Sequence, residues 1–183
     1  MAWIVKNSGT QQIDRRAEPY LTDQMQAELR EKYLPRFPTK QAATLPALHL
    51  VQHRWNWIPY QAIEEVAAFL ELKPADVYDT ATFYEEFFLE PKGRYLVQIC
   101  QSIACELCGH ETLADRFKAR YDIEDMETTD DGRFTLMMVE CIGACGGAPA
   151  VLINGRLYEH VSWEQLEQTL DGLPDDPAAF ESH

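Results

Sequence analysis

Two stretches of the sequence decide the fold: they read YLVQICQSIAC at residues 95–105 and FTLMMVECIGAC at residues 134–145. Each begins with a short run of apolar and β-branched residues, which is typical of a buried strand. Each run leads directly into a pair of cysteines. The pattern predicts strands over residues 94–99 and 134–139, each followed by a cysteine-bearing loop.

The four cysteines of these stretches are Cys100, Cys105, Cys141 and Cys145. Residues 109–121 have helical periodicity, so a helix is expected to connect the two strands. A strand–helix–strand unit gives a parallel pair with a right-handed crossover. Because parallel strands end at the same edge of a sheet, the two loops should emerge side by side and bring four thiols together. That edge is where α/β sheets usually bind ligands.

The remainder of the C-terminal half completes a small α/β domain. Asn154 and Gly155 predict a two-residue hairpin turn between strands at 150–153 and 157–161. A capping box at Ser162 predicts the start of the last helix. The order strand, helix, strand, hairpin, helix predicts a thioredoxin-like α/β domain that lacks one helix.

The N-terminal half has only helical periodicity. Apolar stripes place four helices between residues 20 and 85, and Pro59 and Pro74 begin the last two. The expected fold class is therefore α+β, a helical bundle followed by a thioredoxin-like α/β domain. The expected organisation is an N-terminal arm at 1–20, the helical bundle at 21–90, the thioredoxin-like domain with the cysteines at 91–174 and an acidic tail at 175–183.

The composition excludes several classes of protein. The chain of 183 residues has 30 acidic and 16 basic residues, a formal net charge of −14. A nucleic-acid-binding surface needs Lys and Arg to neutralise phosphates, so nucleic acid is not an expected partner. No apolar run approaches the length of a membrane-spanning helix, and the first twenty residues lack a signal-peptide pattern. We therefore expect a cytoplasmic protein with no direct membrane insertion.

All five cysteines lie between Cys100 and Cys145, which favours metal or redox chemistry over a disulfide framework. Four thiolates suit an iron–sulfur cluster or a zinc ion. Structural zinc sites more often use two Cys-x2-Cys pairs, which the two loops do not provide cleanly. Gly143, Gly146 and Gly147 in the second loop let backbone N–H groups approach sulfur atoms. The pattern favours a cluster, with zinc binding and thiol redox chemistry as alternatives.

The fifth cysteine, Cys108, permits two other assignments. With Cys105 it forms a Cys-x2-Cys pair at a strand-to-helix junction, where thioredoxins keep their redox thiols. The spacing Cys100-x4-Cys105-x2-Cys108 with a distant fourth cysteine also resembles that of plant-type ferredoxins. The plant-type assignment leaves the paired Cys141 and Cys145 unexplained and requires a different order of strands and helices.

With these motifs the chain resembles the thioredoxin-like 2Fe–2S subunit of respiratory NADH:quinone oxidoreductase (complex I). The same family serves NAD-dependent formate dehydrogenases and NAD-linked hydrogenases. The resemblance covers about residues 20–170. The segments that carry it are the two cysteine pairs with Gly109 and Ala148-Pro149, and the runs DGRFTL at 131–136, ALHLVQ at 47–52, WIP at 57–59 and VYDTATFY at 77–84.

The resemblance implies that Cys100, Cys105, Cys141 and Cys145 ligate one 2Fe–2S cluster. Cys108 departs from the family pattern and is left out of the ligand set. The implied function is electron transfer as a subunit of an NADH dehydrogenase, with no catalytic residue and no complete active site in this chain. FMN and NADH are expected on a partner flavoprotein that passes single electrons to the cluster. The absence of a G-x-G-x-x-G motif after a strand agrees with this division of roles.

The resemblance also implies a place in a complex. The chain is expected among the subunits of a peripheral arm, associated with the membrane only through other subunits, or in the mitochondrial matrix if it is a processed eukaryotic chain. The alternatives are the equivalent subunit of an NAD-dependent formate dehydrogenase or hydrogenase and, in other classes, a zinc-stabilised interaction module or a thiol–disulfide oxidoreductase.

Overall fold

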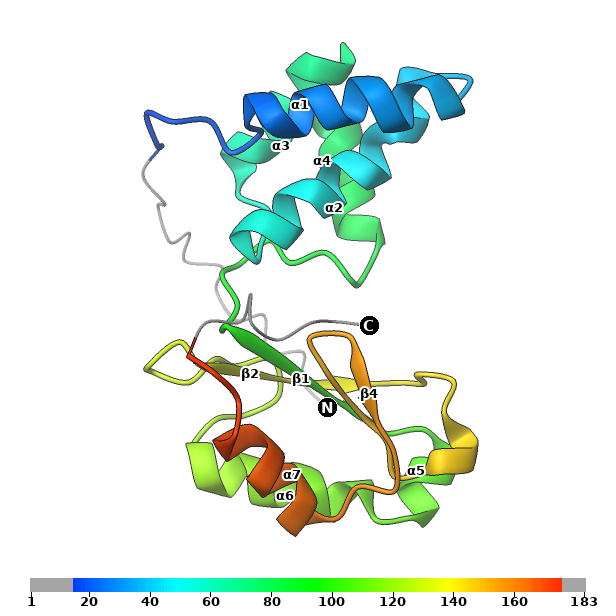
Figure 1. Ribbon diagram of the computed structural model, residues 1–183, viewed down its shortest axis with the longest axis vertical. Helices are drawn as coiled ribbons and strands as arrows, with labels where there is room; N and C mark the ends of the chain where they lie inside the picture. Colours follow the sequence, from blue (N-terminus) through cyan, green and yellow to red (C-terminus); the bar gives the residue numbers. More distant parts are fainter. Residues whose placement is uncertain (1–14, 176–183) are drawn as a thin grey trace, which may run out of the picture. The chain divides into compact units, whose positions relative to one another are not determined.

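The computed structural model describes residues 15–175, which form two compact units that divide between Glu90 and Pro91 (Figure 1). Most of the expected arm at 1–20 and of the expected tail at 175–183 lies outside the described residues. The first unit is helical, and the second combines helices with a mixed sheet. This confirms the predicted α+β class. None of the described helices is long and apolar enough to cross a membrane.

The first unit is a bundle of four α-helices, of which the first two are connected through a π-helical turn (Leu29–Tyr33) and two 3₁₀ turns (Leu34–Arg36 and Lys40–Ala43). Its core is formed by the apolar stripes that the sequence predicts, and Leu48, Val51 and Val66 are fully buried. Pro46 lies in the first turn of its helix. A backbone N–H in that turn has no partner within the helix, so the proline removes no hydrogen bond and is compatible with the start of the helix. The helices are α1 (Asp23–Glu28), α2 (Thr44–Trp55), α3 (Tyr60–Leu70) and α4 (Pro74–Phe83).

The second unit is built on a four-stranded sheet in the order β2-β1-β3-β4. The pair of β1 with the edge strand β2 is parallel, and the pairs β1–β3 and β3–β4 are antiparallel. This is the predicted parallel pair with a helical crossover. The strands are β1 (Tyr95–Cys100), β2 (Phe134–Val139), β3 (Val151–Ile153) and β4 (Arg156–Tyr158), and the helices are α5 (Ile103–Leu107), α6 (His110–Tyr121) and α7 (Trp163–Asp171).

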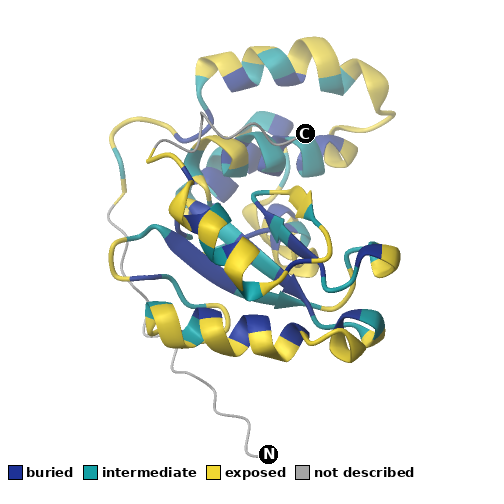
Figure 2. Ribbon diagram, turned by 60° about the horizontal axis from the view of Figure 1, so that its bottom comes forward, coloured by how far each residue is buried: buried dark blue, intermediate teal, exposed yellow. Residues whose placement is uncertain are grey.

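Helices α6 and α7 lie side by side on one face of the sheet (Figure 1). Both helices alternate between buried and exposed residues along their length (Figure 2). This pattern is expected of helices that pack one face on a sheet and expose the other face to solvent. Phe117 of α6 is fully buried, and its ring lies 4.7 Å from that of Tyr121 and 6.2 Å from that of Phe134. These aromatic contacts join the crossover helix to β2.

The hairpin turn between β3 and β4 follows the prediction. Asn154 and Gly155 both have positive φ values, 47° and 83°, which a two-residue hairpin turn of this type requires. The Asn154 side chain also accepts a hydrogen bond from the Leu96 N–H at 2.8 Å and donates one to the Arg94 carbonyl at 3.0 Å. The turn is therefore anchored to the start of β1.

One element differs from the prediction. The sequence pattern predicts a loop between Cys100 and Cys108, but residues Ile103–Leu107 form the short helix α5. Ala104, Glu106 and Leu107 all have high helix propensity. A single helical turn contains too few residues to display a periodic apolar stripe, and the two large apolar side chains of α5 face solvent.

Replacing Phe117 by Ala should lower the free energy of unfolding of the second unit by about 3–5 kcal/mol, because it leaves a cavity in a closely packed core. Denaturant titration measures this loss. The matched control is Leu107→Ala, since Leu107 is 84% exposed and its truncation should change stability by less than about 0.5 kcal/mol. Equal losses in the two variants would contradict the packing described here.

A second expectation concerns pH. The carboxylate of Asp131 accepts hydrogen bonds from the Thr129 hydroxyl and the Arg133 N–H, and these bonds lower its pKa. A lowered folded-state pKa means that the stabilisation is present above the unfolded-state pKa and is lost as the pH falls through the folded-state value. Asp131→Asn should therefore lower the free energy of unfolding at neutral pH, but by less than about 1 kcal/mol, since the carboxylate is exposed. Urea titrations at several pH values should show this difference vanish in acid; a constant difference would contradict it.

Candidate functional site

The parallel register of β1 and β2 places the two cysteine loops at one edge of the sheet, as predicted. Cys100 is paired with Val139 at the ends of the two strands, and Cys141 follows two residues later. The other two thiols come from α5, which carries Cys105, and from the single 3₁₀ turn η4 (Cys145–Gly147). Two segments that are distant in sequence, residues 100–105 and 141–145, therefore contribute to one edge of the sheet.

The four thiols predicted as ligands lie close enough to interact. Cys100 interacts with Cys105 and with Cys141, and Cys141 interacts with Cys145. Cys100 and Cys105 are only 3% and 2% exposed, whereas Cys141 and Cys145 are exposed. All five cysteines of the chain are free thiols. The site is thus buried on the side of the sheet and open on the side of the second loop.

Backbone N–H groups are directed at the sulfur atoms. The Gly143 N–H donates a hydrogen bond to Cys141 Sγ at 3.5 Å. Gly143 has a φ of 79°, a conformation that favours glycine, so this loop shape depends on the residue type. Other backbone hydrogen bonds reach Cys100 and, from Ala150, Cys105. Such bonds stabilise negative charge on sulfur and tune the properties of a metal bound to it.

The thiols influence one another's ionisation. Burial opposes the ionisation of Cys100, but backbone hydrogen bonds, first that of Ser102, outweigh burial and lower its pKa. Burial raises the pKa of Cys105, and the neighbouring Cys100 raises it further. The charge of Cys141 raises the pKa of Cys145. The thiols therefore resist losing their protons together, and a metal cation is the kind of group that removes this mutual repulsion.

The donor set is of a kind that binds metal. Four thiolates can hold one zinc ion or be shared between the two iron atoms of a 2Fe–2S cluster. The N–H donor at the Cys141 sulfur is the kind of group that tunes an iron–sulfur cluster.

Cys108 stands apart from the other thiols. It lies at the C-terminal end of α5 with an exposed side chain, and its N–H is bonded to the carbonyls of Ala104 and Cys105. Cys108 is not among the main groups that shift the pKa values of Cys100, Cys105 and Cys145. The exposed position at the end of α5 therefore sets Cys108 apart from the other four thiols.

One part of the site has no recognisable sequence pattern. The segment after β4 runs beside the second cysteine loop, where the His160 N–H donates to the Gly147 carbonyl at 2.7 Å and the Val161 N–H donates to the Pro149 carbonyl at 3.1 Å. The Ala148–Pro149 peptide bond in this loop is cis. These contacts join residues far apart in the sequence, so only a knowledge of the hairpin's path would have pointed to them.

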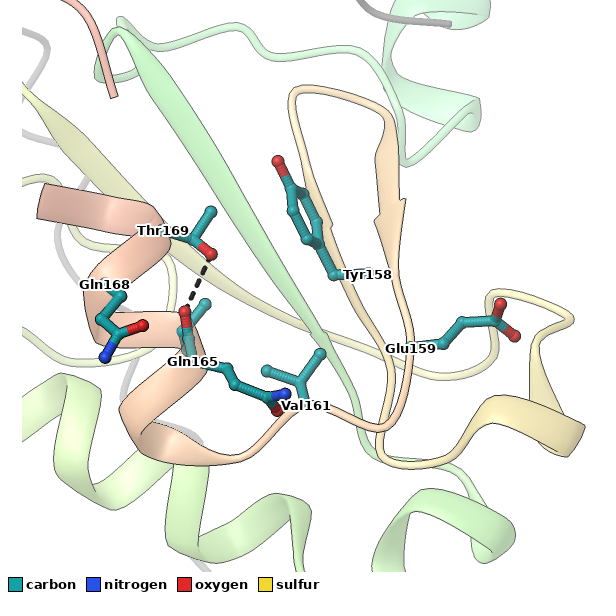
Figure 3. Close-up of a pocket in the computed structure, with 7 residues that line it drawn as sticks. Tyr158, Glu159, Val161, Gln165, Gln168 and Thr169 are labelled. Atoms are coloured by element: carbon teal, nitrogen blue, oxygen red, sulfur yellow. Dashed lines mark hydrogen bonds between the residues drawn. The ribbon is translucent and has the colours of Figure 1, made fainter. Parts of the chain in front are cut away.

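A cavity among the described residues lies away from the cysteines. It has a volume of about 420 Å³ and lies between β4 and α7 (Figure 3). Tyr158, Val161 and Gln165 are among the residues that line it, and the Thr169 hydroxyl donates to the Gln165 carbonyl beside it. Glu159 is the one carboxylate among its lining residues, and its side chain points away from the others in Figure 3. We therefore assign the chemistry to the cysteine site.

Comparison with known proteins also points to the cysteine site. The chain matches the family model described as "Thioredoxin-like [2Fe-2S] ferredoxin" over residues 30–174. An NADH-quinone oxidoreductase subunit of Rickettsia bellii (strain RML369-C) is 38% identical over 157 residues, which cover 84% of this chain and 94% of the relative. The corresponding NADH-quinone oxidoreductase subunit of Rhizobium meliloti (strain 1021) is 38% identical over 138 residues, which cover 75% of this chain and 82% of the relative.

Solved structures with a similar fold come from a hydrogenase. A chain of the NAD+-reducing [NiFe]-hydrogenase in the H2-reduced state aligns with 76% of this chain at a TM-score of 0.64 and 25% identity. A chain of the same enzyme in the air-oxidised state aligns with 70% of this chain at a TM-score of 0.63 and 27% identity. This chain spans only 25% and 22% of those solved chains.

The fold, the paired thiols and the comparisons agree. The predicted thioredoxin-like fold and the predicted family are both confirmed, and the family description names the cofactor that the four thiols suit. The chain belongs to the thioredoxin-like [2Fe-2S] ferredoxin family.

Proposed function

We propose that this chain is an electron-transfer subunit that carries one 2Fe–2S cluster in the NADH-oxidising module of a respiratory NADH:quinone oxidoreductase. Its cluster accepts single electrons from the FMN of a partner flavoprotein, which also binds NADH. The chain meets the membrane only through other subunits of the complex.

The observation that carries this proposal is the meeting of four thiols at one edge of the sheet, in a chain that is similar over most of its length to NADH-quinone oxidoreductase subunits. The net charge of −14 agrees with a subunit whose partners are proteins rather than nucleic acids.

A bound 2Fe–2S cluster supplies a carrier of one electron at a time. The residues of this chain bind and orient it: we propose Cys100 and Cys105 as the ligands on the buried side and Cys141 and Cys145 as those on the open side. The apolar Ala150 packs against the buried pair and excludes water there. No side chain of this chain needs to transfer a proton or a hydride, because hydride chemistry belongs to the flavin.

The proposed ligand set predicts different effects for two cysteine substitutions. Cys145→Ser should lower the iron retained per chain by roughly tenfold or more, since it removes a direct ligand. Cys108→Ser should retain iron, sulfide and the visible spectrum of the wild-type chain, because Cys108 is exposed at the end of α5. Iron and sulfide analysis after anaerobic purification measures both. The reverse result would support the plant-type assignment.

Alkylation gives an independent readout of the same set. In the loaded chain iodoacetamide should modify Cys108 alone. After chelator treatment, the exposed Cys141 and Cys145 should react as well, and the buried Cys100 and Cys105 should react last. Mass spectrometry of the digested chain identifies the modified residues, and protection of Cys108 by the cofactor would contradict the proposed set.

The function itself is tested by electron paramagnetic resonance of the anaerobically purified, reduced chain. A signal from one 2Fe–2S cluster, with two irons and two sulfides per chain, is expected. A colourless chain with stoichiometric zinc would instead establish the zinc-stabilised module. An iron-free chain that cycles between a Cys105–Cys108 disulfide and the dithiol would establish the thiol–disulfide oxidoreductase.

The solved structures also fit a different host complex, which is the alternative proposal. The hydrogenase neighbours, at TM-scores of 0.64 and 0.63, fit an equivalent subunit of an NAD-linked hydrogenase. The family resemblance adds an NAD-dependent formate dehydrogenase as a further host. The identity of the subunits that co-purify with this chain separates the hosts. A quinone-reducing assembly is expected, and a nickel-containing or formate-oxidising assembly would establish the alternative.

The exposed face of α5 is the proposed contact for the flavoprotein. Ile103 and Leu107 are 72% and 84% exposed, lie one helical turn apart and flank the ligand Cys105. Substituting both by Ser should weaken co-purification of the flavoprotein by about tenfold or more, because truncated interface anchors cost on the order of 2 kcal/mol. The cluster content should not change.

The matched control for this experiment is Leu157→Ser, an equally apolar side chain that is 44% exposed on β4. It should leave co-purification intact. Unchanged binding by the double α5 variant, or equal weakening by the control, would contradict the assignment of this face.

A further inference from the structure

The segment after β4 is tied to the second cysteine loop through its backbone. The bonds from the His160 N–H to the Gly147 carbonyl and from the Val161 N–H to the Pro149 carbonyl run one after the other, at 2.7 Å and 3.1 Å. His160 adopts a φ of 52°, a left-handed conformation that is uncommon for a residue other than glycine. The two bonds therefore hold the backbone of this segment beside the loop.

Glu159 lies directly against that loop. A Cβ atom added to Gly147 would come within 2.6 Å of Glu159 Cγ, so the glycine leaves the space that the glutamate side chain fills. In Figure 3 the Glu159 carboxylate points away from the other labelled side chains and towards the loop that carries η4. Cys145, a proposed ligand, is the first residue of η4.

The charge of this carboxylate is not neutralised by an ion pair. Glu159 takes part in none of the salt bridges found among residues 15–175, whereas other glutamates of the same unit, such as Glu164 and Glu167, pair with arginines. Glu140, the other carboxylate beside the second loop, accepts a hydrogen bond from the Gln101 side chain. Glu159 is thus an exposed carboxylate that lies against the turn carrying Cys145.

We propose that Glu159 sets the reduction potential of the cluster by holding a negative charge against the Cys145–Gly147 turn. This inference rests on the proposed function. Reduction adds one electron from the partner's reduced flavin and makes or breaks no bond in this chain, so it increases the negative charge next to Glu159. A nearby anion disfavours that increase, and the potential is lower than it would be without the carboxylate.

The test is the midpoint potential of the full chain loaded with its cluster, measured by redox titration with electron paramagnetic resonance. Glu159→Gln keeps the size of the side chain and removes its charge. It should raise the equilibrium constant for one-electron reduction by about threefold to tenfold, and a tenfold change corresponds to about 59 mV. The shift should shrink at high salt, since the carboxylate is exposed.

Two further variants separate charge from packing. Glu159→Asp keeps the charge and shortens the side chain, so its midpoint potential should stay close to that of the wild-type chain. Asp130→Asn is the matched control, because it removes an exposed carboxylate at the opposite end of β2 and changes the net charge equally. It should not shift the potential.

A readout that does not depend on electron transfer completes the test. Hydrogen exchange of the His160 and Val161 amides reports whether the segment stays bonded to the loop, and Glu159→Gln should leave their protection unchanged. Loss of protection together with the potential shift would show a structural role and overturn the proposal.

The remaining outcomes are also decisive. An unshifted potential in Glu159→Gln, or an equal shift in Asp130→Asn, would overturn the role of Glu159 while leaving the proposed function standing. A wild-type chain that binds no cluster would overturn both. The failure of the Glu159 role can thus be distinguished from the failure of the proposed function. The first is observed in a wild-type chain that binds its cluster, and the second in a wild-type chain that binds none.

Discussion

The site depends on the parallel pairing of β1 with β2. The register that places Cys100 beside Val139 brings the two cysteine loops to the same edge of the sheet. A slip of one residue would reverse which face each side chain of the strand occupies and would separate the thiols. The apolar face of the crossover helix α6 helps to hold this register, because its buried Phe117 packs on Phe134 at the start of β2. The chemistry of the site is therefore set by backbone hydrogen bonds and by an apolar core beneath it.

Backbone groups, more than side chains, shape the surroundings of the four thiols. The Gly143 N–H bonds to one sulfur, and the Gly147 carbonyl anchors the segment that carries Glu159. A rigid environment of this kind suits one-electron transfer, in which the protein supplies position and electrostatics while the cofactor carries the charge. Cys141 and Cys145 remain exposed, which agrees with the proposed role as one subunit of a larger complex.

Much of this architecture was predictable because its signals are local. Hydrophobic periodicity and prolines indicated the four helices of the first unit, and the Asn154-Gly155 pair indicated the hairpin. The helix α5 escaped prediction, since a single turn with exposed Ile103 and Leu107 has no apolar stripe towards the core. The separate place of Cys108 followed in the sequence from a family resemblance, and the structure adds a physical reason, an exposed position at the end of that helix.

The sequence by itself determined the two units, the strand–helix–strand order and the two cysteine pairs, because residue type and spacing encode helices, strands and turns over short distances. Only the tertiary structure decided which thiols are buried, which backbone N–H groups meet them, and that Glu159 lies against Gly147. These features depend on how the hairpin returns past the second loop. Contacts between segments distant in the chain come from packing and sheet register, which no local pattern of residues specifies.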